Sequence, residues 1–146
     1  LIPEQFVTNM VKFDWIIRDV IIWHRTERIQ ENAYDKTRHR RDAERVFRFV
    51  KKPVAYFETK GHSYYRSSVQ SFPYDPRKGS GFPYELVDMA IKESCPKNGI
   101  ILDPMAGLGT TGVVAKMNNR AYILIDIVKE MCDGMRKRLN QENVSK

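Results

Sequence analysis

Residues 99–126 read GIILDPMAGLGTTGVVAKMNNRAYILID, and this stretch decides the fold of the chain. Its apolar run at 100–102 is of the kind found in a strand that is buried on both faces of a parallel sheet. Asp103-Pro104 ends that strand, because proline removes a backbone donor and fixes φ. A glycine-rich turn then leads into a helix, and residues 121–125 form a second strand that ends at Asp126. The stretch therefore predicts a strand–turn–helix–strand unit.

The turn and the end of the second strand together predict a site for an adenosine-containing cofactor. A glycine turn lets a ligand approach the backbone closely, and the helix N-terminus offers unpaired amide donors. Thr110 or Thr111 stands where the helix cap is expected. Asp126 lies 19 positions after Gly107, and a carboxylate at that strand end can accept hydrogen bonds from ribose hydroxyls. The alternative is an ordinary βαβ unit whose acidic residue only faces solvent.

The type of cofactor depends on the residues around the turn. Gly107, Gly109 and Gly112 spell the dinucleotide fingerprint G-x-G-x-x-G, which is weak when it stands alone. Two features disfavour an NAD-dependent or FAD-dependent enzyme: Asp103-Pro104 interrupts the turn, and the chain stops about one helix after Asp126. An acidic residue before the turn suits a ligand with a cationic end, such as the sulfonium and amino groups of S-adenosylmethionine.

Three segments resemble those of the amino-group DNA methyltransferases, which methylate the exocyclic nitrogen of adenine or cytosine. Residues 103–111, DPMAGLGTT, are similar to the DPFxGSGTT cofactor motif. Residues 82–87, FPYELV, resemble the FPxxL segment before it, and residues 120–126, RAYILID, resemble the R-x-x-I-G-I-D/E strand. Met105 stands where the family has phenylalanine, Leu108 replaces serine, and Leu124 replaces glycine. The resemblance is strong over 82–126 and diffuse over 12–57.

The resemblance implies S-adenosylmethionine as the cofactor, together with the residues that bind it. They are Phe82, Pro83, Asp103, Pro104, Met105, Ala106, Gly107, Gly109, Thr110, Thr111 and Asp126. Within this set Phe82 and Pro83 are expected to line the pocket. No metal site is expected, because Cys95 and Cys132 fit no metal-binding spacing.

The catalytic motif of the resembled family is missing from these 146 residues. Methylating an exocyclic amine needs a group that accepts its hydrogen bonds, so that the nitrogen lone pair can attack the sulfonium methyl. The family uses an Asp/Asn/Ser-Pro-Pro-aromatic motif that acts on a flipped base. In one motif order of the family this motif comes earlier, so Leu1 is expected to lie after it in a longer product. A second chain is the alternative source, and we expect the isolated fragment to be inactive.

The net charge of +7 is unevenly distributed along the chain. Residues 25–52 hold ten Lys/Arg against five Asp/Glu, an excess of +5. A basic surface attracts phosphate backbones without reading sequence. Beside a methyltransferase motif, this segment predicts DNA as a partner, with candidate contacts at Arg38, Arg40, Arg41 and Arg45. A solvated loop with surface ion pairs is the alternative.

We expect a single α/β domain over 1–146, with a Rossmann-like sheet of the S-adenosylmethionine-dependent methyltransferase type that is incomplete. Its parts are the far-edge strands and basic loop (1–58), a loop (59–81) and the cofactor-binding βαβ region (82–146). The pattern predicts a helix at 3–13, a strand at 15–23, and an edge hairpin of 45–50 with 54–57. A sheet without its central strand exposes apolar edges, so the chain is expected to need the missing piece for stability.

The main functional prediction is the cofactor-binding and partly DNA-binding region of an amino-specific DNA methyltransferase, of the kind found in restriction–modification. The alternative is a non-catalytic nucleic-acid-binding or regulatory module with the same fold. No apolar run approaches the roughly 18 residues of a membrane span, and no signal peptide is visible. With two cysteines that are expected to be reduced, we predict a cytoplasmic location and no membrane partner.

Overall fold

The computed structural model describes residues 2–26, 42–58, 67–73 and 82–141. The chain divides into two compact units. The first comprises Leu1–Ala55 with His62–Pro73, and the second comprises Tyr56–Gly61 with Tyr74–Lys146. The single domain expected over 1–146 stays a prediction. Within the described ranges, no helix combines the length and the apolar character needed to cross a bilayer.

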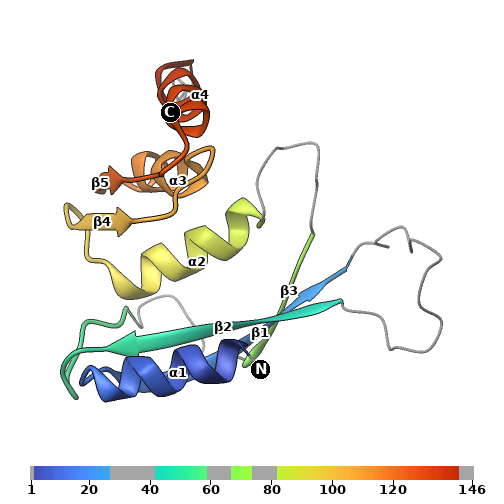
Figure 1. Cartoon of the computed structure of the whole chain (residues 1–146), viewed down its shortest axis with the longest axis vertical. Coiled ribbons are helices and arrows are strands. Elements are labelled where there is room, and N and C mark those ends of the chain that lie inside the picture. The colour runs from blue at the N-terminus through green and yellow to red at the C-terminus, as the bar shows by residue number, and fades with distance from the viewer. Residues whose placement is uncertain (1, 27–41, 59–66, 74–81, 142–146) are drawn as a thin grey trace. The chain divides into compact units, whose positions relative to one another are not determined.

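The first unit is a three-stranded sheet with helix α1 (Ile2–Lys12). Strand β1 (Ile16–Arg25) is central, pairing antiparallel with β2 (Ala43–Val50) and parallel with β3 (Val69–Phe72). Helix α1 runs along the β1–β2 pair (Figure 1). There the Phe6 ring meets the Phe49 ring edge-on, with 6.2 Å between centroids. The helix at 3–13 and the strand at 15–23 are confirmed.

Two expectations for this unit are wrong. Residues 45–50 do not pair with 54–57. They belong to β2, whose register with β1 runs from Ile16↔Val50 to His24↔Ala43, and residues 54–58 form no strand. Strand β3 lies inside the stretch 59–81, which the sequence presents as a loop. Both errors have one cause, because a short strand is stabilised by hydrogen bonds to a partner that local pattern does not reveal.

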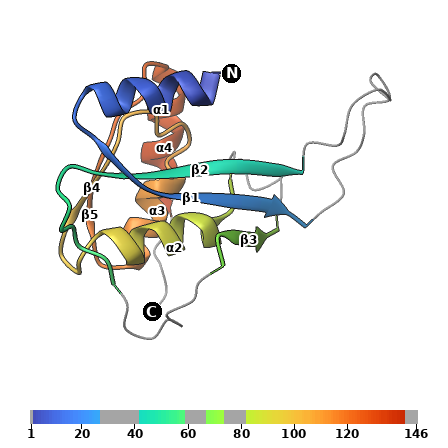
Figure 2. The same ribbon diagram turned by 90° about the horizontal axis from the view of Figure 1, so that it is seen from below.

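The second unit contains the predicted strand–turn–helix–strand, now seen as β4 (Ile100–Asp103), α3 (Thr110–Met117) and β5 (Ala121–Leu124). Helix α2 (Tyr84–Ser94) precedes it and helix α4 (Lys129–Gln141) follows it. Strands β4 and β5 are parallel and lie side by side in both ribbon views (Figures 1 and 2). The local prediction for 99–126 is confirmed.

The core of the second unit is formed by two helices and one face of the β4–β5 sheet. Val87 and Ile91 of α2 meet Val114 and Ala115 of α3 in a buried cluster. Side chains that are partly buried pack against it from α2 and the two strands: Tyr84, Ile101 and Tyr122. Because α3 connects the two parallel strands, this cluster fixes the helix against the sheet and thereby places the turn that begins α3.

Within the described part of the second unit, no helix covers the other face of the β4–β5 sheet. Along each strand the residues alternate between exposed and partly buried. Ile100 is 67% exposed, Leu102 60% and Ile123 53%, so these three apolar side chains form a surface that we call the open sheet face. The expectation that the run at 100–102 is buried on both faces is therefore wrong for this chain. Helices cover one face, and parallel sheets in complete proteins have both faces covered.

Arg120 ties the end of α2 to the start of β5. Its side chain donates to the Cys95 carbonyl oxygen from Nε (3.2 Å) and Nη2 (2.8 Å). Nη1 donates to the Asn118 carbonyl oxygen at 2.6 Å. Arg120 is only 9% exposed, so these carbonyl groups replace water around a buried guanidinium.

Candidate cofactor-binding site

The glycine turn between β4 and α3 presents open backbone. Gly107 and Gly109 have positive φ angles, 52° and 77°, a conformation that strains residues with a side chain. A Cβ atom on Gly107 would meet nothing within 4 Å, whereas one on Gly109 would lie 2.6 Å from Cγ of Met135. Gly107 therefore faces free space that a ligand can enter, and Gly109 is packed against α4.

Asp126, just beyond β5, holds this turn in place. Its Oδ2 accepts a hydrogen bond from the Gly107 backbone N–H (2.8 Å), and its Oδ1 accepts one from the Val128 N–H (2.9 Å). The backbone hydrogen bonds from Val128 and Gly107 hold the pKa of the Asp126 carboxyl below its ordinary value. Asp126 is therefore ionised at neutral pH, beside the open backbone of Gly107.

Asp103, the last residue of β4, organises the other side of the turn. Its Oδ1 accepts from the Met105 backbone N–H at 3.0 Å, and its Oδ2 accepts from the Thr111 hydroxyl at 2.6 Å. The carboxyl ends of parallel strands meet at one edge of a sheet, which is where such folds bind ligands. Asp103 and Asp126 accordingly lie at the same edge, and each bonds the backbone of the turn.

The two threonines at the start of α3 do not cap the helix, so that expectation is wrong. The N-cap residue is Gly109, in the left-handed conformation, and it makes no side-chain cap hydrogen bond. Only glycine takes this backbone conformation at little cost, so the threonines fall inside the first turn. There Thr111 binds Asp103, and Thr110 Oγ1 accepts a hydrogen bond from Nη1 of Arg138 at 3.4 Å.

Arg138 of α4 links the first residue of α2 to the glycine turn. Its Nη1 donates to the Leu108 carbonyl oxygen (3.2 Å), and its Nη2 donates to the Tyr84 hydroxyl. Pro83 is the N-cap residue of α2 and is buried, while Phe82 is exposed. Arg138 thus joins the glycine turn to Tyr84, the residue that directly follows the predicted pocket-lining pair.

The eleven predicted cofactor residues all lie in the second unit, around the turn and the start of α2. Met105 is 84% exposed, and Ala106 beneath it is buried. The residue that sequence reasoning missed is Arg138, which lies outside the three segments that carry the resemblance. No local signal identifies its partner, because Tyr84 lies 54 positions away.

Of the four arginines predicted to contact DNA, the structure describes Arg45. Arg38, Arg40 and Arg41 lie outside the described residues. Arg45 of β2 pairs with Glu4 of α1, with 2.6 Å between Nη2 and Oε1, and this hydrogen bond lowers the pKa of Glu4. The Arg45 guanidinium also lies 5.6 Å from the centroid of the Phe47 ring. The DNA-binding role of these residues stays a prediction.

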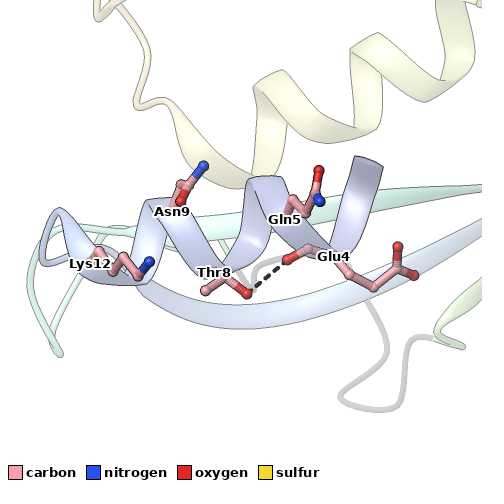
Figure 3. A pocket seen from close by; sticks show the side chains of 5 residues that line it. All are labelled: Glu4, Gln5, Thr8, Asn9 and Lys12. Carbon is pink, nitrogen blue, oxygen red and sulfur yellow. Dashed lines mark hydrogen bonds between the residues drawn. The ribbon is translucent and has the colours of Figure 1, made fainter. Parts of the chain in front are cut away.

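Neither of two hollows on the described surface contains a predicted cofactor residue. One lies along α1, where Thr8 Oγ1 donates to the Glu4 carbonyl oxygen at 2.9 Å (Figure 3), and its lining residues are Glu4, Gln5, Thr8, Asn9 and Lys12. The other, about 210 Å³, lies between β5 and α4 and is lined by Tyr122, Leu124, Cys132, Met135, Arg136 and Leu139. Over the described ranges, no three His, Cys, Asp or Glu side chains gather to hold a metal ion. The candidate site is therefore the glycine turn itself.

The chain is similar to several known DNA methyltransferases. The type II methyltransferase M.Cfr9I of Citrobacter freundii is 27% identical over 155 residues, which cover 99% of this chain and 51% of the relative. The crystal structure of M1.HpyAVI matches with a TM-score of 0.74 and 25% identity, covering 93% of this chain and 68% of that one. The cytosine-N4-specific PvuII DNA methyltransferase matches with a TM-score of 0.80 over 96% of this chain and 57% of that one; at 16% identity it shows the fold alone.

These matches confirm the predicted α/β fold of the S-adenosylmethionine-dependent methyltransferase type, with a sheet that is partial here. The chain spans about half the length of M.Cfr9I and of M.XycI, another curated relative. A protein-family model described as DNA methylase matches residues 4–137, from α1 into α4. The chain belongs to this N6/N4 DNA methylase family.

Proposed function

We propose that this chain is the cofactor-binding part of an S-adenosylmethionine-dependent DNA methyltransferase that acts on an exocyclic amino group of adenine or cytosine. The observation that carries the proposal is the turn in which the Asp126 carboxylate bonds the Gly107 amide beside open space. Membership of the DNA methylase family supports it, as does the structure of the similar protein M1.HpyAVI as a SAM complex.

The residues of the turn fit S-adenosylmethionine. The ionised Asp126 carboxylate keeps lone pairs beyond its two backbone bonds, and these would accept hydrogen bonds from the ribose hydroxyls. Asp103 would attract the cationic amino group, and Gly107 would allow close approach to the backbone. The rest of the pocket would be shaped by Phe82, Pro83, Pro104, Met105, Ala106, Gly109, Thr110 and Thr111. When bound, the cofactor supplies a methyl group activated by its sulfonium charge.

The group that accepts hydrogen bonds from the target amine is proposed to lie in another segment. These 146 residues contain no Asp/Asn/Ser-Pro-Pro-aromatic motif, so the isolated chain is expected to be inactive. The motif would come from an N-terminal portion of the same polypeptide or from a second chain. The open sheet face supports such a complement, because parallel sheets are normally covered on both faces.

DNA contact is proposed for the basic segment, with Arg38, Arg40, Arg41 and Arg45 as candidates. Cationic side chains neutralise phosphates whatever the sequence, so this segment would position the DNA without reading it. A cytoplasmic restriction–modification role is proposed as well. It rests on the expectation that the two cysteines stay reduced, as in a reducing compartment, and on the type II methyltransferase names of similar proteins.

Calorimetric titration of the chain with S-adenosylmethionine tests the proposal. Asp126→Asn removes the ionised acceptor and is expected to weaken binding by roughly tenfold or more, the loss typical of a hydrogen bond to a charged group. The matched control is Asp133→Asn. Asp133 lies on α4 of the same unit and pairs at the surface with Arg136 and Lys129, so this variant should bind like the wild type.

Each outcome of the titration is decisive. If the wild type and Asp126→Asn bind S-adenosylmethionine with equal affinity, Asp126 does not contribute to cofactor binding. A folded wild-type chain that takes up no S-adenosylmethionine at millimolar concentration would overturn the proposal that this chain carries the cofactor site. Saturable binding of NAD in its place would support the dinucleotide alternative.

A further inference from the structure

We propose that Arg138 is a positioning residue: it sets the glycine turn against the start of α2 and so fixes the shape of the cofactor site. The inference rests on the proposed function, since it concerns the same site. It also goes beyond that function, because Arg138 belongs to none of the motifs that point to the cofactor. Arg138 reaches the site from α4, which follows the second strand.

The guanidinium of Arg138 contacts both sides of the site at once. Nη1 donates to the Leu108 carbonyl oxygen at 3.2 Å and lies 3.4 Å from Thr110 Oγ1. Nη2 donates to the Tyr84 hydroxyl, and Cζ stands 5.4 Å from the centroid of the Tyr84 ring. A planar guanidinium presents donors in a rigid fork, so one side chain holds two backbone segments in a fixed relation.

The glycine turn needs such a tether. Leu108 stands between Gly107 and Gly109, and glycine loses more conformational freedom on ordering than any other residue. Holding the Leu108 carbonyl restricts rotation on both sides of it. Helix α4 supports the turn at a second place, because a Cβ atom on Gly134 would lie 3.2 Å from Cδ2 of Leu108. The absence of a side chain at Gly134 lets Leu108 rest close to the helix.

The other end of the tether is the start of α2. Tyr84 is the first residue of α2 and packs against the buried cluster. It directly follows Phe82 and Pro83, the pair expected to line the pocket. Because cofactor contacts are expected from this pair and from the turn, the bridge through Arg138 sets the spacing between two walls of one site. Losing the bridge would widen the range of spacings that the free protein samples, and binding would then have to restore one of them.

A double-mutant cycle on the full 146-residue chain tests this role. Arg138→Met keeps an apolar stem and removes the fork, and Tyr84→Phe removes only the hydroxyl. Arg138→Met is expected to weaken S-adenosylmethionine binding by roughly tenfold, because binding must then order the two segments that the bridge holds in wild type. The loss of binding free energy in the double variant should be smaller than the sum of the losses in the two single variants, because both changes break the same bridge. Arg136→Met, on the exposed face of the same helix, should bind like the wild type.

Affinity and stability are read separately, by calorimetric titration and by thermal melting. If the Arg138→Met variant has a lower melting temperature than the wild type but the same affinity for S-adenosylmethionine, Arg138 only stabilises the fold. That result would overturn the inference. Strictly additive losses would overturn it too, since the two side chains would then act independently. If Arg138→Met does not fold, Arg138→Lys takes its place, because lysine keeps the charge without the fork.

Failure of the proposed function can be told apart from failure of this inference. If the wild-type chain binds no S-adenosylmethionine, the proposed function fails, and the amide NMR signals of Gly107 and Gly109 then test the tether alone. Arg138→Lys should shift both signals, whereas Arg136→Met should leave them in place. If the Gly107 and Gly109 signals are the same in Arg138→Lys and in the wild type, Arg138 does not hold the glycine turn and the inference is overturned.

Discussion

Charged side chains of the second unit bind backbone groups and thereby hold segments of chain together, among them Asp126, Arg120 and Arg138. Asp126 accepts from two backbone N–H groups, at Gly107 and Val128. Arg120 donates to the carbonyl oxygens of Cys95 and Asn118, and Arg138 donates to that of Leu108. Hydrogen bonds with a charged partner are roughly twice as strong as neutral ones. Single residues therefore decide where the turn and the ends of the strands lie.

Asp126 makes stability depend on pH. Backbone hydrogen bonds from Val128 and Gly107 lower its pKa below the ordinary value of 3.8. A carboxyl with a lowered folded-state pKa contributes stability that is present above the unfolded value and is lost as pH falls through the folded value. The free energy of unfolding of the wild type should therefore exceed that of Asp126→Asn near neutral pH. In urea denaturation series the difference should shrink below about pH 4; a difference that does not change with pH would contradict this.

Arg120 is expected to be costly to remove, because its buried guanidinium binds two backbone carbonyl groups. Arg120→Met leaves the Cys95 and Asn118 carbonyl groups without their donor, which should lower the free energy of unfolding by about 3 kcal/mol. The matched control, Arg136→Met, changes a side chain that is 74% exposed and should stay within about 0.5 kcal/mol of the wild type. Urea denaturation of both variants measures this, and equal stabilities would show that the buried hydrogen bonds contribute little.

At the scale of elements, the turn between β4 and α3 is a joint product of its glycines and of α4. Gly107 and Gly109 supply the positive φ angles, but their surroundings differ. Gly109 rests against Met135 of α4, while Gly107 has free space beside it. One glycine therefore serves packing, and the other leaves the backbone open for a ligand.

This difference predicts that an alanine at Gly109 mainly lowers stability, whereas an alanine at Gly107 mainly lowers cofactor affinity. Gly109→Ala adds a clash with Met135 to the backbone strain and should lower the free energy of unfolding by about 3 kcal/mol. Gly107→Ala carries only the strain, about 1 kcal/mol, but its methyl group fills the space proposed for the cofactor. We expect Gly107→Ala to fold and to lose affinity for S-adenosylmethionine in calorimetric titration. A Gly107→Ala variant with wild-type affinity would show that the ligand does not approach there.

At the scale of the whole molecule, the chain has two compact units, each with its own small sheet. Two strands make only a short parallel sheet, and the open sheet face of Ile100, Leu102 and Ile123 carries apolar side chains without a covering layer. This surface agrees with the proposal that a further segment or a second chain completes the fold.

The open sheet face should bind a hydrophobic dye. The double variant Leu102→Gln/Ile123→Thr should lower ANS fluorescence and change the free energy of unfolding by no more than about 0.5 kcal/mol, because the side chains are already exposed. The control is Val54→Gln, a change at an exposed valine of the first unit, which should leave the signal as it is. A loss of several kcal/mol in the double variant would show that the chain buries this face itself.

The sequence alone determined the strand–turn–helix–strand of 99–126. The signals are local: a proline and two glycines mark the turn, and apolar spacing marks each element. The same residues carry the resemblance to the amino-group methyltransferases, so the family could be predicted from that resemblance. Asp126 could be placed at the site because its distance from Gly107 along the chain is set by the length of one helix and one strand.

Only the tertiary structure decided which distant segments meet. Strand β3 pairs with β1 across a gap that no local pattern bridges, and the hairpin expected at 45–57 gives way to pairing between β1 and β2. Arg138 finds Tyr84 54 positions away, and the strand expected to be buried on both faces leaves one face open. The physical reason is the same in each case. Local spacing encodes the conformation of a segment, whereas its partner is chosen by burial and hydrogen bonding across the folded chain.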